Sequence, residues 1–476
     1  MDRSWIARLR RSEDLLPAAG LLVATALYAL PLLKNISYWG RTDWDQFTFL
    51  NAVPYESLLR YGQFPLWNPF SNGGNTILAM PHSAFLSPQF LLVLLHGPVV
   101  GVKLQWIAGV FAGMMGMYAL ARRLALPPVS RCLPPAVFML SSHYTLHLRE
   151  GHLEWTAMAI MPWTVLCLLR SRTERSFLAW TALSMALMIY SGGVYVFAAT
   201  AVFLGLHATG SAWIEKKAAP LTGLAVVFAL TFLLASAKLV PMLELLRESP
   251  RPTKDEGRLE AVLLPKLLLS RGQNALYENR AELPARLGLQ WWDREGWHEF
   301  GAYVGAIPLL LSLAGLYAFW ERHKPLAWAG AACLWISMGR TAWFVDLWSV
   351  LHRLPVYRSL QVPSRFLMCV LFCLALFAGL GLSLLEKGAT TKARRWALAA
   401  LVALVAADLL AVCRPIAAGA FTIPPYVIAR APDFRQGGDP FDSYRRMGSN
   451  SAMYPALLAN RGTIKSYDIV GVTRGR

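Results

Sequence analysis

The chain has 476 residues, of which 55% are hydrophobic and only 16% are charged, and its mean hydropathy is +0.40. Soluble proteins carry about 45–50% apolar and about 25% charged residues, so this composition excludes a soluble enzyme, a disordered chain and a disulfide scaffold. The net charge of +18 comes from basic residues scattered between apolar segments, which indicates membrane topology rather than nucleic-acid binding. The six cysteines lie in or beside apolar segments, so we expect neither disulfides nor a zinc site.

Eleven apolar runs are candidate membrane spans. They cover residues 15–33, 99–121, 129–146, 154–169, 176–190, 192–208, 219–237, 302–320, 325–338, 364–385 and 395–412. Alternate short connections carry basic clusters such as Arg122 with Arg123, which places the N-terminus in the cytoplasm and, with an odd number of spans, the tail outside. The sequence therefore predicts an all-α polytopic membrane protein, with a transmembrane domain over residues 1–412 and a small extracytoplasmic segment over residues 413–476.

The first extracytoplasmic loop, residues 34–98, holds the carboxylates nearest to the expected membrane surface. Asp43 and Asp45 are candidates for a general base that takes a proton from an attacking hydroxyl just above the lipid headgroups. Either aspartate can instead cap the helix that follows, because Asp is favoured at that position. Residues 47–61 and 85–95 predict helices, of which the second is too short to cross the bilayer and is expected to lie in the interface.

The second extracytoplasmic loop is rich in histidine and acidic residues. His143 and His147 are one helical turn apart and could bind a metal, although polar residues at a break between spans also simply hydrate a turn. Arg149, His152 and Glu154 are candidates to hold a substrate near the first-loop aspartates.

Basic residues open the third large loop, residues 238–301. Lys238, Arg247 and Arg251 could together form an anion site at headgroup depth, suited to a lipid phosphate. The alternative for Lys238 is snorkelling from the membrane end to the interface.

Two further groups of candidates lie at the ends of later spans. Arg365 starts a long apolar run and, with Arg358, is a second candidate pair for a phosphate, unless these charges only set topology. Glu299 lies next to a span among aromatic residues and is a candidate for contact with a sugar.

Several short motifs occur in one order along the chain. They are Asp43-Trp44-Asp45, Pro65-Leu66-Trp67-Asn68-Pro69 with Gly73-Gly74, Gly151-His152, Pro162-Trp163, Glu299 with Tyr303-Val304-Gly305, Pro363-Ser364-Arg365-Phe366 and Tyr467-Asp468. With these motifs the chain resembles, over nearly its whole length, the YfhO-like bacterial membrane proteins, which are relatives of the GT-C glycosyltransferases. The Pro-Leu-Trp-Asn-Pro segment carries most of this resemblance.

The resemblance implies a GT-C-like fold and an enzyme of the bacterial cytoplasmic membrane. Such an enzyme takes a sugar from a polyprenyl-phosphate carrier on the extracytoplasmic face and passes it, with inversion, to an envelope glycan, lipid or protein. The role of base then falls on Asp43, with Asp45 as the alternate, because the spacing to Gln46 departs from that of related proteins. The motifs also add Gln46, Trp67, Asn68 and Tyr303 to the substrate-binding candidates. No metal ligand is assigned, and a divalent ion such as Mg²⁺ or Mn²⁺ stays open as a cofactor.

The alternative functions are a transporter or flippase for lipid-linked glycans and a non-catalytic assembly partner. A transporter is expected to carry charges in the middle of spans and often has paired halves. In this sequence Asp408 is the main mid-span charge, and we find no internal repeat. Polar and aromatic residues are concentrated in the loops instead, which favours chemistry at the membrane surface.

Overall fold

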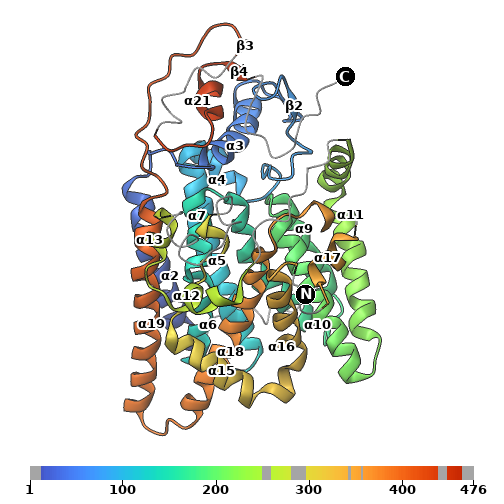
Figure 1. Ribbon diagram of the computed structural model, residues 1–476, viewed down its shortest axis with the longest axis vertical. Coiled ribbons are helices and arrows are strands. Elements are labelled where there is room, and N and C mark those ends of the chain that lie inside the picture. The colour runs from blue at the N-terminus through green and yellow to red at the C-terminus, as the bar shows by residue number, and fades with distance from the viewer. Residues whose placement is uncertain are drawn as a thin grey trace.

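The computed structural model describes residues 12–248, 259–279, 296–340, 345–354, 357–437 and 447–463, which form a bundle of helices with a smaller cap at one end (Figure 1). The longer helices are α2 (Ser12–Lys34), α3 (Trp44–Leu59), α5 (Pro98–Arg123), α8 (Met161–Ser171), α9 (Phe177–Tyr190), α10 (Val194–Glu215), α11 (Ala219–Glu248), α15 (Ala306–Ala318), α16 (Trp320–Ser337), α18 (Leu367–Lys387) and α19 (Lys392–Ala418). The shorter α-helices are α4 (Phe90–His96), α6 (Leu133–Met139), α7 (Ser142–Glu150), α12 (Leu264–Leu269), α13 (Gln273–Glu278), α17 (Leu347–His352) and α21 (Met453–Leu458). The 3-10 helices are η1 (Ser130–Cys132), η2 (Leu153–Ile160), η3 (Ala261–Leu263), η5 (Trp297–Glu299), η6 (Tyr357–Ser359) and η7 (Pro363–Phe366).

Six helices in the described ranges are long and apolar enough to cross a bilayer, and each coincides with a predicted span. These are α2, α5, α10, α11, α19, and α18 together with η7. The chain is therefore a largely helical membrane protein. The other five predicted runs fall on shorter or interrupted helices. The run at 129–146, for example, divides into α6 and α7 at Ser141.

Helix α18 forms the centre of the bundle. In its most apolar stretch 83% of the residues are buried, compared with 28% in α2 and in α11. Its backbone approaches α15 where Gly315 faces Gly381, since a Cβ at Gly381 would lie 2.0 Å from the carbonyl oxygen of Leu311. Small residues at such crossings allow close van der Waals packing, which drives helix association in a bilayer.

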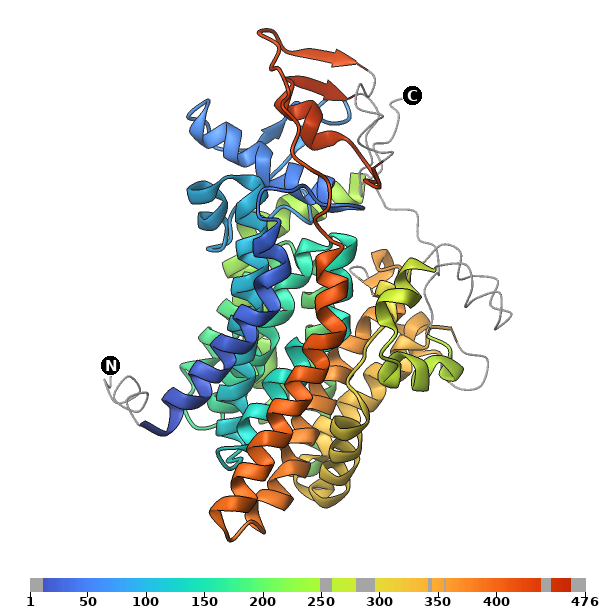
Figure 2. The ribbon, with the colours of Figure 1, turned by 90° about the vertical axis from the view of Figure 1, so that its left-hand side faces the viewer.

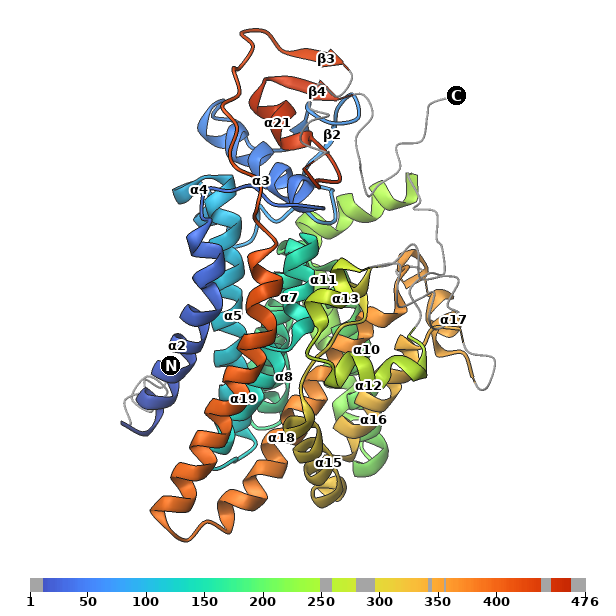
Figure 3. The same ribbon diagram turned by 60° about the vertical axis from the view of Figure 1, so that its left-hand side comes forward.

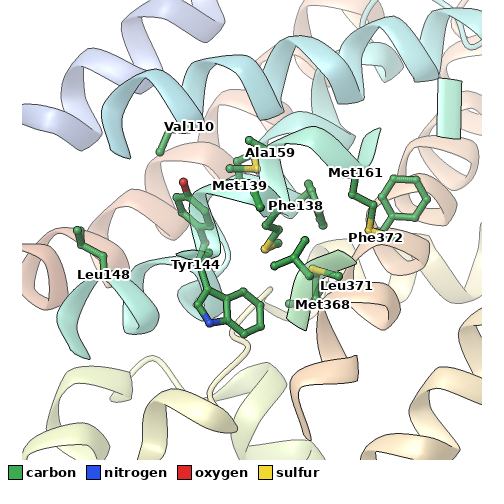
Figure 4. Packing of buried hydrophobic residues seen from close by; sticks show 14 of the residues in the cluster. Val110, Phe138, Met139, Tyr144, Leu148, Ala159, Met161, Met368, Leu371 and Phe372 are labelled. Atoms are coloured by element: carbon green, nitrogen blue, oxygen red, sulfur yellow. The ribbon is translucent and has the colours of Figure 1, made fainter. Parts of the chain in front are cut away.

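Large side chains fill the interior around α18. The ring of Phe138 packs edge-on against Phe372, with their centroids 5.7 Å apart, and Met139 and Met161 lie in the same cluster (Figure 4). This core extends from α6 and α8 to α18. It therefore holds α6 and α8 against the long helix α18.

The cap combines the first loop with the C-terminal segment. In the first loop, β1 (Trp67–Asn68) pairs antiparallel with β2 (Asn75–Thr76), and in the tail, β3 (Arg435–Gly437) pairs in parallel with β4 (Arg461–Thr463). Helix α21 packs on α3, and Trp39 forms a backbone bridge with Ile423. Figure 3 shows α3 and α21 in the cap beyond the ends of α5, α7 and α19.

Both chain segments of the cap leave the bundle at the same end. Helices α2 and α19 run side by side toward the cap, while the connection between α18 and α19 lies at the opposite end (Figure 2). That connection carries Lys387 and Lys392. The first loop and the tail therefore share one side of the bundle, opposite one of the basic connections.

Candidate functional site

The position of Asp43 is fixed by contacts with the end of α7. Its backbone N–H donates to the carbonyl oxygen of Glu150 at 3.0 Å. Gly151 follows with φ +101°, and a Cβ there would lie 2.4 Å from the backbone nitrogen of Trp44, so only glycine fits this approach. The next residue, His152, is thereby placed beside the Asp43 side chain.

The Asp43 carboxylate is held by two polar partners. Nε2 of His152 lies 3.5 Å from Oδ2, and the side-chain amide of Asn450 donates to Oδ1 at 2.6 Å. Burial alone would raise the pKa of Asp43, but the hydrogen bond and charge of His152 outweigh it and hold this pKa below its ordinary value. The carboxylate is therefore ionised at neutral pH.

His152 is the cation that balances Asp43. Burial would lower the pKa of His152, but the carboxylates of Glu154 and Asp43 outweigh burial and raise this pKa to about 9. Its Nδ1 lies 2.9 Å from Nδ1 of His147. Burial lowers the pKa of His147 well below its ordinary value. A protonated His152 thus donates on both sides, to Asp43 and to a neutral His147.

A buried ion pair lies close to these groups. Arg365 donates from Nε and Nη2 to the two carboxylate oxygens of Glu299 at 2.9 and 2.5 Å, and its guanidinium lies 4.2 Å from the centroid of the Tyr195 ring. Burial would raise the pKa of Glu299, but Arg365 and His298 hold it well below its usual range. His298 also lies 3.4 Å from Oε2 of Glu150.

Together these residues form what we call the Asp43 cluster, defined as Asp43, His152, His298, Glu299 and Arg365. The rings of His152 and His298 connect its two halves, with centroids 5.0 Å apart. The five side chains come from four separate segments: the start of α3, the α7–η2 junction, η5 and η7. The structure therefore brings together four sequence candidates and adds His298.

Three members of the cluster offer ligand atoms that converge. The ligand atoms of His152, His298 and Glu299 lie within 4.8 Å of one another, which among the described residues is the arrangement closest to a metal site. Its histidine-rich donor set would suit Zn²⁺ rather than the Mg²⁺ or Mn²⁺ left open by the sequence. Arg365, however, already donates to both oxygens of Glu299. We therefore assign no metal to the cluster and derive no step through one.

The predicted metal pair of the second loop makes other contacts. Nδ1 of His143 lies 3.3 Å from the carbonyl oxygen of Gly301, and the ring of His147 stacks on Trp155 with centroids 3.7 Å apart. Nε2 of both histidines and Nε1 of Trp155 are buried and have no hydrogen-bond partner within the described ranges. Such groups suit contact with water or a hydroxylated ligand better than shared metal coordination.

Asp45 anchors the tail rather than joining the Asp43 cluster. Its carboxylate accepts backbone hydrogen bonds from Met453 at 2.7 Å and Tyr454 at 3.1 Å, and one from the Ser451 hydroxyl. It thereby caps the first turn of α21, where a negative charge is favoured. Asp45 is 1% exposed. These contacts are structural, and the role of alternate base for Asp45 stays a prediction.

Lys238 is likewise occupied by structural contacts. Its ammonium donates to the backbone carbonyl oxygens of Pro81, Ser83 and Ile189 at 3.1, 2.5 and 2.8 Å, and the residue is 1% exposed. An ammonium has three donors, so none is left for a phosphate. These contacts give no support to phosphate binding by Lys238, which stays a prediction.

Other predicted substrate-binding residues have local roles or face solvent. Arg247, Arg358 and Trp67 are exposed, and Arg251 lies outside the described residues. These positions give no support to a second phosphate pair at Arg358.

Three more of the predicted residues are buried in the fold. Asn68 donates to the Ser71 hydroxyl at 2.8 Å and stabilises the turn between β1 and β2. Tyr303 donates to Asp408 at 2.6 Å, so the main mid-span charge has a partner. Gln46 is buried on α3, one residue after Asp45.

Sequence reasoning missed His298 and Asn450. His298 directly precedes Glu299, and this adjacency was the available signal. Asn450 is 407 residues from Asp43 in the chain, and its segment carries no recognisable motif. Only the packing of the tail on the first loop brings it to the carboxylate.

Comparison with known proteins gives no match, either to a protein-family model or to a curated protein. A function for this chain is therefore argued from the Asp43 cluster and its surroundings.

The Asp43 cluster predicts a pH dependence of stability. The pKa of His152 rises from 6.5 to about 9 on folding, so its stabilisation is fully present below pH 6.5 and is lost as the pH rises through 9. We expect the thermal unfolding temperature of the purified protein to fall between pH 7 and pH 10, and His152→Gln to flatten this slope. His96→Gln, at the exposed end of α4, is the control and should keep the slope. An unchanged slope in His152→Gln would contradict the assignment.

Proposed function

We propose that the chain is a GT-C-like membrane glycosyltransferase. It takes a sugar from a polyprenyl-phosphate carrier and transfers it, with inversion, to an envelope glycan, lipid or protein. The proposal includes the orientation that the sequence predicts, with eleven spans, a cytoplasmic N-terminus and the cap outside the bacterial cytoplasmic membrane. The observation that carries it is the ionised carboxylate of Asp43, held beside His152 where the cap meets the apolar bundle.

In the proposed reaction Asp43 is the general base. The acceptor hydroxyl gives its proton to the carboxylate while its oxygen attacks the anomeric carbon, and the bond from that carbon to the phosphate oxygen breaks. The electron pair of the broken bond leaves with the polyprenyl phosphate. The lowered pKa of Asp43 keeps it ionised at neutral pH, and protonated His152 offsets its charge before the proton arrives.

The remaining residues of the Asp43 cluster position this pair. Glu299 and Arg365 satisfy each other's charge and hold His298 against Glu150. Nε2 of His143, Nε2 of His147 and Nε1 of Trp155 have no hydrogen-bond partner among the described residues, and in this proposal they contact sugar hydroxyls. A buried polar ligand gains from such groups, because each is costly to leave without a partner.

The test is transfer by the purified protein in detergent. The protein is incubated with a panel of polyprenyl-phosphate sugars and with envelope glycan, lipid and peptide acceptors. We expect one donor to yield a product whose anomeric configuration, read by NMR, is opposite to that of the donor. A product that retains the configuration, or no product with any donor and acceptor pair, would contradict the proposal.

A further inference from the structure

A cavity of about 220 Å³ lies between the first loop, the end of α7 and α13. It is lined by Arg41, Thr42, Arg149, Tyr277 and Glu278. Pockets for drug-sized ligands have about 300–1,000 Å³, so this cavity suits a small group rather than a whole sugar. It adjoins the Asp43 cluster, because Thr42 directly precedes Asp43, and Glu150, which follows Arg149, lies 3.4 Å from His298 of the cluster.

Arg149 is buried beside this cavity with donors to spare. It is 4% exposed, and its Nη2 pairs with Glu278. Its Nε and Nη1 have no hydrogen-bond partner in the part of the chain that the structure describes. Since an unpaired buried donor costs free energy, an acceptor in the cavity would stabilise this guanidinium. The planar, fixed donors of arginine match the oxygens of a phosphate.

Arg41 supplies a second guanidinium, and the tail shapes the space for both. Nε of Arg41 is also buried and lacks a hydrogen-bond partner among the described residues. A Cβ at Gly448 would lie 2.7 Å from this Nε, and a Cβ at Gly419 would lie 2.3 Å from Cζ of Arg149. Each guanidinium therefore lies against a glycine and occupies the space that a larger side chain at the glycine position would fill.

We infer that the Arg41–Arg149 cavity binds a phosphate group. Glu278 is the one acidic residue in its lining, so two guanidinium groups face a single carboxylate and the cavity favours an anion. The proposed function identifies the source as the polyprenyl phosphate that leaves in the reaction, and this part of the inference rests on that function. Arg149 then takes the role that the sequence suggested for Lys238, Arg251 and Arg365.

Gly419 offers a variant that moves Arg149 without removing its charge. The residue has φ −83° and ψ −7°, which alanine adopts without strain, so Gly419→Ala should displace the guanidinium and leave the backbone in place. Gly388 is a matched control because it ends α18 with φ −79° and ψ −6°. A Cβ there would come no closer than 3.6 Å to another residue.

The experiment measures equilibrium binding of labelled inorganic phosphate and of labelled polyprenyl monophosphate to the full chain in detergent. We expect the unsubstituted protein to bind both, and Arg149→Gln and Gly419→Ala to weaken binding at least tenfold. Glu278→Gln should tighten binding, because it removes the competing carboxylate, and Gly388→Ala should leave it unchanged. Unchanged affinity in both Arg149→Gln and Gly419→Ala would overturn the inference.

The two phosphate probes separate this inference from the proposed function. If the protein binds inorganic phosphate but not polyprenyl monophosphate, the inference that the bound phosphate group belongs to the lipid carrier is overturned. If phosphate binding depends on Arg149 but the protein has no transferase activity, the phosphate site in the cavity is supported and only the proposed glycosyltransferase function is contradicted. Transfer by Arg149→Gln with the donor KM of the unsubstituted protein would overturn the cavity's role and leave the function standing.

Discussion

Replacing Asp43 with asparagine is expected to lower the rate of sugar transfer by about 10²- to 10⁴-fold, because the acceptor hydroxyl loses its general base. Asparagine has nearly the same shape and can still accept the hydrogen bond from Asn450, and Glu154 remains as a carboxylate near His152, so the variant should remain folded although less stable. Initial rates at saturating donor, measured together with the thermal unfolding temperature, would show this separation. Normal turnover by the folded variant would contradict the assignment of Asp43.

Asp45→Asn is the matched control, with the same substitution two residues away. Its carboxylate accepts hydrogen bonds from the backbone of Met453 and Tyr454 and from Ser451, so the amide leaves part of this set unpaired. We expect the free energy of unfolding to fall by about 1–3 kcal/mol and the tail to become easier to cleave by protease. Transfer per folded molecule should stay close to normal. Loss of transfer with unchanged stability would indicate that the two aspartates have been assigned the wrong way round.

Arg365→Met is expected to have the largest effect on stability. The substitution leaves Glu299, whose side chain is 1% exposed, as a buried charge without its main partner. Breaking a buried ion pair in this way costs about 3–5 kcal/mol of the free energy of unfolding. The measurement is the unfolding of the purified variant in detergent, with Arg358→Met, on an exposed arginine, as the control.

The double variant Arg365→Met with Glu299→Gln makes the test specific. If the two side chains act as a pair, the combined loss of stability should be smaller than the sum of the single losses by about 0.5–3 kcal/mol. Additive losses would contradict the pairing. A single Arg365→Met variant that keeps its stability but binds donor more weakly would instead show that Arg365 contacts the phosphate.

Apolar patterning alone predicted the class of fold. Six of the eleven apolar runs coincide with helices of spanning length, because a span must satisfy its backbone internally and its sequence must be apolar throughout. The run at 129–146 was harder to interpret, since the apolar α6 is followed, after a break at Ser141, by α7, which mixes apolar with polar and charged residues. A break of this kind depends on packing against neighbouring helices, which hydropathy does not describe.

The candidate site was predicted in part. Asp43, His152, Glu299 and Arg365 stood out as charged or titratable residues beside apolar runs. Asp43 and Asp45 could not be distinguished, because the partners that separate them, Asn450 and Ser451, lie about four hundred residues further along the chain. The choice between them is made by the packing of the tail on the first loop.

The same limit applies to the cations at membrane ends. Lys238 and Arg365 have similar sequence surroundings, yet three backbone carbonyls occupy Lys238 while a buried carboxylate occupies Arg365. Arg149 differs from both, because its Nε and Nη1 have no hydrogen-bond partner in the ranges that the structure describes. Which cation remains available for a ligand depends on contacts between distant segments, and the sequence does not indicate them.

The most direct test of the glycosyltransferase assignment is the stoichiometry of donor cleavage in proteoliposomes. Donor labelled in both the sugar and the polyprenyl phosphate is supplied with acceptor, and both labelled products are counted over time. The account predicts that the unsubstituted protein releases polyprenyl phosphate and glycosylated acceptor in equal amounts, and that Asp43→Asn releases neither. Movement of intact donor across the bilayer, without cleavage and unaffected by Asp43→Asn, would contradict it and indicate a transporter.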